Sequence, residues 1–240
     1  MSALRVFCDF DGTVAKKDVG RELFLHFGGP RTAEIGMQYV DGTITARECL
    51  LSDAALVSGV GAQELAGFVD QFEVDESFPK FREFCSQAHI PLTILSDGLD
   101  FYVERILKRN GLGDCSFYAN HVEFPIVDGV SRFNVSFPYT DSECLFCGNC
   151  KRNHMLTLSS DEDTIVYIGD GISDRCPARY ADVVFAKKDL IRYCQQSNTS
   201  YFEYNNFGDV QNRLELLLSK KSIKKRREAE MARRDVFMQG

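Results

Sequence analysis

Apolar residues along this 240-residue chain follow two patterns. Short runs of apolar, β-prone residues predict buried strands, and apolar residues that recur every three or four positions predict helices. Strands that alternate with helices indicate an α/β fold with a doubly wound, mainly parallel sheet. The predicted strands cover residues 4–10, 90–95, 117–124, 131–137, 164–168, 182–186 and 201–204, and the third and fourth are candidates for a hairpin. The helices predicted between them cover 78–88, 99–110, 153–158, 173–180 and 207–218.

Residues 14–77 interrupt this alternation, because they show helical spacing and no strand pattern. Turn-forming Gly, Pro and Asp-Gly sequences divide the stretch into four predicted helices, at 19–27, 33–40, 45–57 and 62–72. We therefore expect an α/β core of residues 1–13 and 78–219, a helical cap of residues 14–77, and a basic tail of residues 220–240. Since the cap begins directly after the first strand, we expect it to act as a lid.

Charge is distributed unevenly along the chain, whose net charge is −7. Residues 220–240 carry eight Lys or Arg against three Asp or Glu, and we expect this tail to be a solvated, frayed helix. The acidic remainder argues against a nucleic-acid partner. No apolar run has the length of a membrane span, and the N-terminus does not have the pattern of a signal peptide. The chain contains nine cysteines, which in the absence of a secretory signal indicate a reducing compartment. The sequence thus predicts a cytoplasmic protein without a membrane partner.

Two aspartates close the first predicted strand, in the sequence Asp9-Phe10-Asp11-Gly12-Thr13. In an extended chain residues two apart share a face, so Asp9 and Asp11 point together from the carboxyl end of the strand. That end of a parallel sheet is where ligands bind. Carboxylates so close repel unless they share a proton or a cation. The pair is therefore an acid/base pair, a hard-metal site or, since Asp-Gly favours turns, a solvated turn.

Four further polar residues lie at junctions between predicted strands and helices: Ser96, Lys151, Asp170 and Asp174. In a parallel sheet such junctions converge on one edge. The carboxylates suit Mg²⁺, and Ser96, Lys151 and the backbone N–H groups near Gly12 would hold a phosphate. Each residue alone has a structural interpretation, as a helix cap, a surface charge or a first-turn acid. Their joint occurrence at junctions favours a shared site.

These four elements together resemble the haloacid-dehalogenase-like (HAD) superfamily, and the likeness spans most of the chain. The elements are the Asp9–Thr13 sequence, Ser96, Lys151 and Gly169-Asp170-Gly171-Ile172-Ser173-Asp174. The inserted helices resemble the cap of phosphoserine-phosphatase-type members. Residues 96–103, 147–151 and 181–186 are similar to a narrower group, the 2-hydroxy-3-keto-5-methylthiopentenyl-1-phosphate phosphatases of methionine salvage. Phosphoethanolamine and phosphocholine phosphatases are a more distant likeness.

The resemblance implies a Mg²⁺-dependent phosphomonoesterase that acts on a small phosphorylated metabolite. Asp9 would form an aspartyl-phosphate, and Asp11 would protonate the leaving oxygen and then activate water. Asp9, the Asp11 backbone carbonyl and Asp170 would hold the metal, and Asp174 would orient its surroundings or Lys151. A dehalogenase would not need Asp11, because a halide leaves without a proton, so phosphate esters are favoured.

Several alternatives stay open at this point. A phosphoserine- or phosphoethanolamine-type phosphatase, or a phosphotransferase, would use the same intermediate. A catalytically inactive binding module is disfavoured because the set of polar residues is intact. Asp18, where the chain enters the cap, is expected to face the substrate and to cap the helix that begins at Val19.

Three cysteines, Cys144, Cys147 and Cys150, are followed by His154 at a spacing compatible with a Cys₃His zinc site. However, Lys151 lies within this group and belongs to the expected phosphate site. We therefore predict thiols without stoichiometric zinc, which elemental analysis of the purified protein can check.

Overall fold

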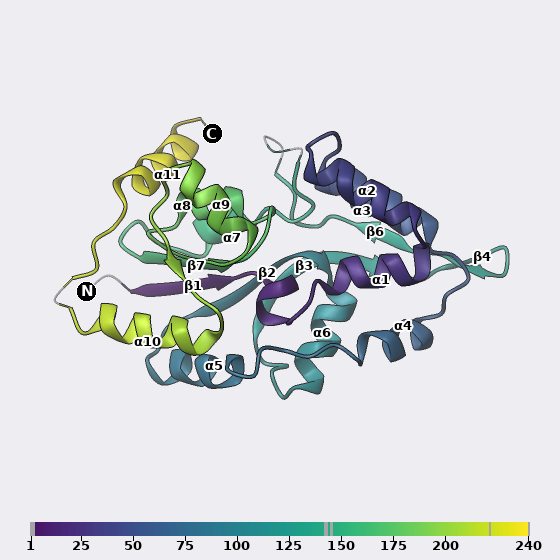
Figure 1. The fold of residues 1–240 in the computed structure, drawn as a ribbon, viewed down its shortest axis with the longest axis horizontal. Helices are drawn as coiled ribbons and strands as arrows, with labels where there is room; N and C mark the ends of the chain where they lie inside the picture. Colours follow the sequence, from purple (N-terminus) through teal and green to yellow (C-terminus); the bar gives the residue numbers. More distant parts are fainter. Residues whose placement is uncertain (1–2, 142–143, 145, 221, 240) are drawn as a thin grey trace. The chain divides into compact units, whose positions relative to one another are not determined.

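The computed structural model describes all residues except 1–2, 142–143, 145, 221 and 240 (Figure 1). Within the described residues, the main sheet has seven strands in the order β6-β3-β2-β1-β7-β8-β9. Neighbours among β2, β1, β7, β8 and β9 pair in parallel, and β3 and β6 pair antiparallel. The predicted fold class is confirmed. The strands are β1 (Leu4–Cys8), β2 (Leu92–Leu99), β3 (Ser116–Glu123), β6 (Asn134–Ser136), β7 (Thr164–Gly169), β8 (Val183–Ala186) and β9 (Phe202–Glu203).

The chain divides into two compact units, and the first comprises Met1–Val14, Asp75–Leu95 and Lys151–Gly240. In it β1 pairs with both β2 and β7, so that Val6 faces Leu92 on one side and Val166 on the other. Val6 and Val166 are completely buried, as expected for the centre of a parallel sheet. Figure 1 shows α5 and α10 on one face of these strands and α7, α8 and α9 on the other. The helices are α5 (Phe78–Gln87), α7 (Lys151–Thr157), α8 (Arg175–Tyr180), α9 (Asp189–Gln196), α10 (Phe207–Leu218) and α11 (Arg227–Gln239).

The second unit comprises Ala15–Val74 and Ser96–Cys150. The four helices expected in the insertion form with nearly the predicted bounds. A capping box between Thr45 and Glu48 begins the third of them, as the Thr-x-x-Glu spacing favours. The helices of this unit are α1 (Val19–Gly28), α2 (Arg31–Val40), α3 (Ala46–Leu56), α4 (Ala62–Val69) and α6 (Asp100–Arg109), and β4 (Ile126–Val127) and β5 (Val130–Ser131) form a small hairpin.

The second unit is larger than the predicted cap of residues 14–77, because residues 96–150 cluster with it. Arg105 of α6 makes two 2.7 Å hydrogen bonds to the Asp70 carboxylate at the end of α4. Arg47 of α3 donates to the Cys147 carbonyl at 2.9 Å. These long-range contacts join the insertion to a later segment, and they have no signature in local periodicity. The boundaries predicted from the sequence for the core, the cap and the tail remain a proposal.

Two short elements were not predicted. Helix α9 is eight residues long, and its apolar residues Leu190, Ile191 and Cys194 have helical spacing, so the sequence carried a helical signal here. The β4–β5 hairpin turns at Asp128 and Gly129, whose φ angles are 52° and 77°. An Asp-Gly pair with both φ angles positive is typical of the two-residue turns that close hairpins, so the sequence carried a signal here.

The basic tail matches the expectation of a solvated, frayed helix only in part. It does form α11, but Arg233 donates to the Asp182 carboxylate at 3.0 Å and Arg226 donates to the Ala178 carbonyl at 3.0 Å. Ala229 is completely buried. Asp182 is itself buried, and a buried carboxylate needs charged or hydrogen-bonding partners. The predicted helix is confirmed, but it is partly packed rather than fully solvated and frayed, because the buried Asp182 pairs with its Arg233.

A buried carboxylate in α3 gives a prediction about stability. Asp53 is 8% exposed, and its Oδ1 has no hydrogen-bond partner among the described residues. Burial raises the pKa of Asp53 from 3.8 to about 6. Because the folded-state pKa is the higher one, the folded protein loses stability as the pH rises from about 4 to about 6. We expect Asp53→Asn to raise the free energy of unfolding by about 1–3 kcal/mol at pH 8 and by roughly a third as much at pH 4.5.

Urea denaturation at the two pH values measures this difference. The exposed Asp161→Asn variant is the matched control, since it removes a carboxylate without relieving burial. An Asp53→Asn protein that is no more stable than wild type at pH 8 would contradict the assignment of Asp53 as a strained buried acid.

Candidate active site

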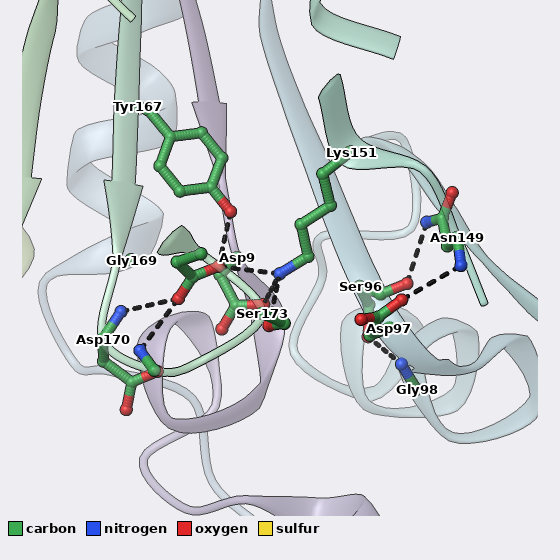
Figure 2. Close-up of polar contacts among 12 residues, drawn as sticks. Asp9, Ser96, Asp97, Gly98, Asn149, Lys151, Tyr167, Gly169, Asp170 and Ser173 are labelled. Carbon is green, nitrogen blue, oxygen red and sulfur yellow. Dashed lines mark hydrogen bonds and ion pairs between the residues drawn. The ribbon is translucent and has the colours of Figure 1, made fainter. Parts of the chain in front are cut away.

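A buried Lys–carboxylate cluster lies at the carboxyl end of β1. The Asp9 backbone N–H donates to the Ile168 carbonyl at 2.9 Å, which fixes Asp9 against β7. Lys151, the first residue of α7, donates to Asp9 Oδ1 at 2.6 Å (Figure 2). Its ammonium donates to Asp174 Oδ1 at 2.8 Å. It also donates to the Ser173 hydroxyl at 3.1 Å. The side chains of Asp9, Lys151 and Asp174 are at most 5% exposed, so their charges interact with little screening by water.

Asp174 is fully engaged in hydrogen bonds. Its Oδ1 accepts from Lys151 and from the Tyr167 hydroxyl, the latter at 2.5 Å. Its Oδ2 accepts from the backbone N–H groups of Asp170 at 2.8 Å and Gly171 at 2.9 Å. These four bonds hold the loop after β7 and the Lys151 ammonium in one geometry. Asp174 is thus suited to orient its neighbours and has little capacity left to bind a metal.

Asp170 lies against the turn Phe10–Val14 that follows Asp9. Gly12 in this turn has φ +74°, and a Cβ there would overlap the Asp170 carboxylate. Glycine is therefore required at position 12 both for its backbone angle and for the close approach. Asp170 Oδ2 also accepts a hydrogen bond from Lys188 at 2.7 Å.

The electrostatics of the cluster favour a bound cation. Burial, followed by the charge of Asp174, raises the pKa of Asp9; Asp170 and Asp11 raise it further, and Lys151 opposes them. Burial and Asp174 likewise raise the pKa of Asp170, against Lys188 and Lys187. Besides burial, the neighbouring carboxylates raise these pKa values by mutual repulsion, which a bound cation would relieve.

The residues present fit Mg²⁺. One oxygen each of Asp9, Asp170 and Asp174 lies within 4.8 Å of the others. In the described part of the chain this is the only group of three or more His, Cys, Asp or Glu side chains so arranged. Because Asp174 is saturated, Asp9 and Asp170 are the carboxylates that remain for a hard divalent ion, which prefers a few carboxylates plus water and phosphate oxygens.

Ser96 belongs to the second unit and lies within β2, since that strand continues to Leu99 beyond the predicted end at residue 95. Its hydroxyl accepts a hydrogen bond from the Gly98 N–H at 3.0 Å. Its carbonyl accepts from the Asn149 amide at 2.8 Å, and the Asn149 N–H donates to Asp97 Oδ1 at 3.0 Å (Figure 2). Asn149 therefore ties the loop that precedes Lys151 to the end of β2.

The structure brings five of the predicted residues together in the first unit: Asp9, Gly12, Lys151, Asp170 and Asp174. Asp11 is close enough for its charge to raise the pKa of Asp9. Asp18 lies in the second unit, where its Oδ1 accepts from the Arg21 N–H at 2.9 Å and caps α1 as predicted. That Ser96 and Asp18 converge on Asp9 stays a prediction.

Sequence reasoning missed four residues of the cluster. Lys187 and Lys188 follow β8 directly, so the strand-end argument used for Ser96 applies to them as well. Burial lowers the pKa of Lys187, whose Nζ lies 4.9 Å from the centre of the Tyr204 ring. Tyr167 and Ser173 gave no distinct signal, because their importance rests on partners far away in the sequence or across a loop.

Among the described residues of the second unit, no three Cys, His, Asp or Glu ligand atoms lie within 4.8 Å of one another. The sulfur atoms of Cys144 and Cys147 are 4.0 Å apart, and the Cys150 sulfur lies 4.0 Å from Asp141 Oδ2. His154 belongs to the first unit, where burial lowers its pKa to about 4. The absence of stoichiometric zinc stays a prediction.

An α/β enzyme with carboxylates gathered at the ends of parallel strands is the class that this fold and site define. A sequence model of the family described as haloacid dehalogenase-like hydrolase matches residues 6–179. The chain belongs to this family and is a hydrolase. No helix among the described residues is long and apolar enough to cross a membrane.

Curated relatives resemble the chain over nearly its whole length. The 2-hydroxy-3-keto-5-methylthiopentenyl-1-phosphate phosphatase of Bacillus cereus (strain ATCC 14579) is 29% identical over 223 residues, covering 92% of this chain and 100% of the relative. The enzyme of the same name from Bacillus cytotoxicus is 29% identical and covers 91% and 99%.

Solved structures share the fold at lower identity. A phospho-aspartyl intermediate analogue of phosphoserine phosphatase has a TM-score of 0.67 at 16% identity, covering 89% of this chain and 99% of that one. A HAD family hydrolase from Salmonella enterica serovar Typhi has a TM-score of 0.69 at 19% identity, with coverages of 88% and 70%. Cytosolic 5′-nucleotidase IIIB bound to cytidine has a TM-score of 0.54 at 15% identity, with coverages of 89% and 87%.

Proposed function

We propose that this hydrolase is a Mg²⁺-dependent phosphatase that cleaves the phosphomonoester of a small metabolite through an aspartyl-phosphate on Asp9. The observation that carries the proposal is the buried Lys151 ammonium held between Asp9 and Asp174, with Asp170 beside them. A strand-end carboxylate paired with a buried lysine provides a nucleophile next to a fixed positive charge. The curated relatives, which are named phosphatases, support the same reaction.

The residues of the cluster have separate tasks. Lys151 opposes the upward shift of the Asp9 pKa and so favours the ionised, nucleophilic form. Asp174 holds Lys151 through the 2.8 Å hydrogen bond, and Tyr167 and the loop N–H groups hold Asp174. When bound by Asp9, Asp170 and the Asp11 carbonyl, Mg²⁺ supplies charge that neutralises the phosphate oxygens. Ser96 and the Gly12 N–H would bind other phosphate oxygens.

The proposed chemistry has two displacements at phosphorus. In the first, an Asp9 carboxylate oxygen bonds to phosphorus, the ester P–O bond breaks, and Asp11 gives its proton to the leaving oxygen. In the second, Asp11 accepts a proton from water as the water oxygen bonds to phosphorus. The bond to Asp9 then breaks, which releases inorganic phosphate and restores the free carboxylate.

Among substrates, we favour a methionine-salvage enol phosphate, because the curated relatives carry that name. A panel of phosphate esters assayed with and without Mg²⁺ tests this choice; it should include the enol phosphate, phosphoserine, phosphoethanolamine and p-nitrophenyl phosphate. The enol phosphate should give the highest kcat/KM, and activity should depend on Mg²⁺. A clear preference for phosphoserine or phosphoethanolamine would favour an amino-alcohol phosphatase. Transfer of phosphate to an added alcohol in preference to water would indicate a phosphotransferase.

Asp170 and Asp11 should differ in how their loss affects the metal. Asp170→Ala removes a proposed ligand, so we expect the Mg²⁺ concentration for half-maximal activity to rise at least about tenfold. Asp11→Asn keeps its backbone carbonyl, so it should retain the Mg²⁺ dependence while kcat falls roughly 10²–10⁴-fold. Mg²⁺ titrations of both variants measure the difference. An unchanged Mg²⁺ dependence in Asp170→Ala would remove Asp170 from the metal site.

Asp18 offers a test that separates helix capping from substrate contact. Asp18→Ala should lower stability by about 1 kcal/mol, because the α1 N-cap is lost, whereas Asp18→Asn keeps a capping side chain. If the carboxylate also faces substrate, both variants should raise KM for the preferred substrate more than for p-nitrophenyl phosphate. Equal KM changes for the two substrates would leave Asp18 with the capping role alone.

A further inference from the structure

Lys188 occupies a fixed position next to the carboxylate cluster. It follows β8 with φ +49° and ψ −125°, angles that non-glycine residues rarely adopt. The backbone on both sides of it is hydrogen-bonded to the end of β7 and to the residue that follows. The Lys187 N–H donates to the Gly169 carbonyl at 3.2 Å, and the Leu190 N–H donates to the Asp170 carbonyl at 3.0 Å. An uncommon backbone conformation held by neighbouring hydrogen bonds is more frequent at functional sites.

The Lys188 ammonium contacts the turn and the carboxylate on which the site is built. Its Nζ lies 2.7 Å from Asp170 Oδ2 and 3.4 Å from the Gly12 carbonyl. The lysine side chain is 56% exposed, whereas that of Asp170 is 11% exposed. The ammonium therefore reaches Asp170 from the solvent side and neutralises an otherwise poorly solvated carboxylate.

A divalent ion in the cluster would have to share the Asp170 carboxylate with Lys188. Asp174 has its oxygens filled by Lys151, Tyr167 and two backbone N–H groups. A divalent ion in the cluster must therefore rely on Asp170 together with Asp9. With the ammonium 2.7 Å from Asp170 Oδ2, the ion and the lysine would compete for the same carboxylate and repel each other.

We propose that Lys188 is an internal counter-ion that competes with the divalent cation for Asp170, so that metal binding requires the ammonium to leave this carboxylate. The inference rests on the proposed function, because it needs the metal site. It adds that this chain weakens its own metal affinity through one lysine. When no metal is bound, the Lys188 ammonium neutralises the charge of Asp170.

Mn²⁺ binding measured by electron paramagnetic resonance tests the proposal without an activity assay. Lys188→Met should bind Mn²⁺ about three- to tenfold more tightly than wild type, since a partly exposed ion pair and its repulsion of the metal are removed. Lys188→Arg keeps the charge and should stay within about twofold of wild type. Lys220→Met, an exposed lysine after α10, controls for the change in net charge.

The controls separate failure of this inference from failure of the proposed function. Asp170→Asn should weaken Mn²⁺ binding in both the wild-type and the Lys188→Met protein. If Asp170→Asn leaves Mn²⁺ binding unchanged, the metal site itself is misplaced. If Asp170→Asn weakens binding but Lys188→Met binds Mn²⁺ no more tightly than wild type, the competition by Lys188 is refuted. An equal increase in Mn²⁺ affinity in the Lys220→Met control would also refute the competition by Lys188. Lys188→Gln provides a second neutral variant, and its thermal melting confirms that the protein is folded.

Discussion

Asp9→Asn is expected to reduce kcat by roughly 10⁴–10⁶-fold, because loss of a covalent nucleophile removes the whole reaction path. An asparagine amide is nearly the same size and can still accept a hydrogen bond from Lys151 at the Oδ1 position. The fold should therefore persist. Stability should not fall, since the substitution removes a buried carboxylate whose pKa burial and nearby acids raise. Steady-state kinetics with p-nitrophenyl phosphate and thermal unfolding measure the two effects.

Trapping of the intermediate gives an independent readout. Acid quenching of wild type with a radiolabelled phosphate ester should leave label on the protein that hydroxylamine releases, as expected for an acyl phosphate. Asp9→Asn should carry no label, and the exposed Asp161→Asn variant should behave as wild type. An Asp9→Asn protein that retains more than about a tenth of the wild-type kcat would exclude Asp9 as the nucleophile.

Much of the fold follows from local pattern. All six residues of β7 are buried, and the run Thr164–Gly169 is apolar enough to be read as a central strand. The elements that the sequence pattern does not predict correctly are held by contacts with residues far away along the chain. Helix α9 packs on β8 and α8, and α11 is held by the hydrogen bond from Arg233 to Asp182, which lies 51 residues earlier in the chain.

The site was predictable wherever a polar residue ends a buried strand or begins a helix. Asp9, Lys151, Asp170 and Asp174 were identified in this way, and they lie together in the first unit. The separate role of each residue could not be predicted from the sequence. That Asp174 orients Lys151 follows from hydrogen bonds to Tyr167 and to two backbone N–H groups, which only the folded loop brings into place. Lys188 was missed because its importance depends on its contact with Asp170.

Lys151→Met is expected to cost both activity and stability. Lys151 is 2% exposed and donates to Asp9, Asp174 and Ser173. Methionine fills a similar volume but leaves two buried carboxylates without their shared cation. Breaking a buried ion pair from one side costs about 3–5 kcal/mol, and losing a fixed charge next to the transferred phosphate should lower kcat roughly 10²–10⁴-fold. Urea denaturation at pH 8 and steady-state kinetics measure these losses.

The pH dependence identifies the cause of the instability. Without Lys151, the upward shift of the Asp9 pKa is unopposed. Because the folded-state pKa then lies further above the unfolded value, the variant should be least destabilised at low pH and lose stability as the pH rises. Adding Asp174→Asn to Lys151→Met removes one of the two facing carboxylates, so it should restore part of the stability at pH 8 but not the activity. Lys220→Met controls for net charge and should change neither property. A Lys151→Met protein as stable as wild type at pH 8, or one whose loss of stability does not depend on pH, would show that Lys151 does not compensate these buried acids.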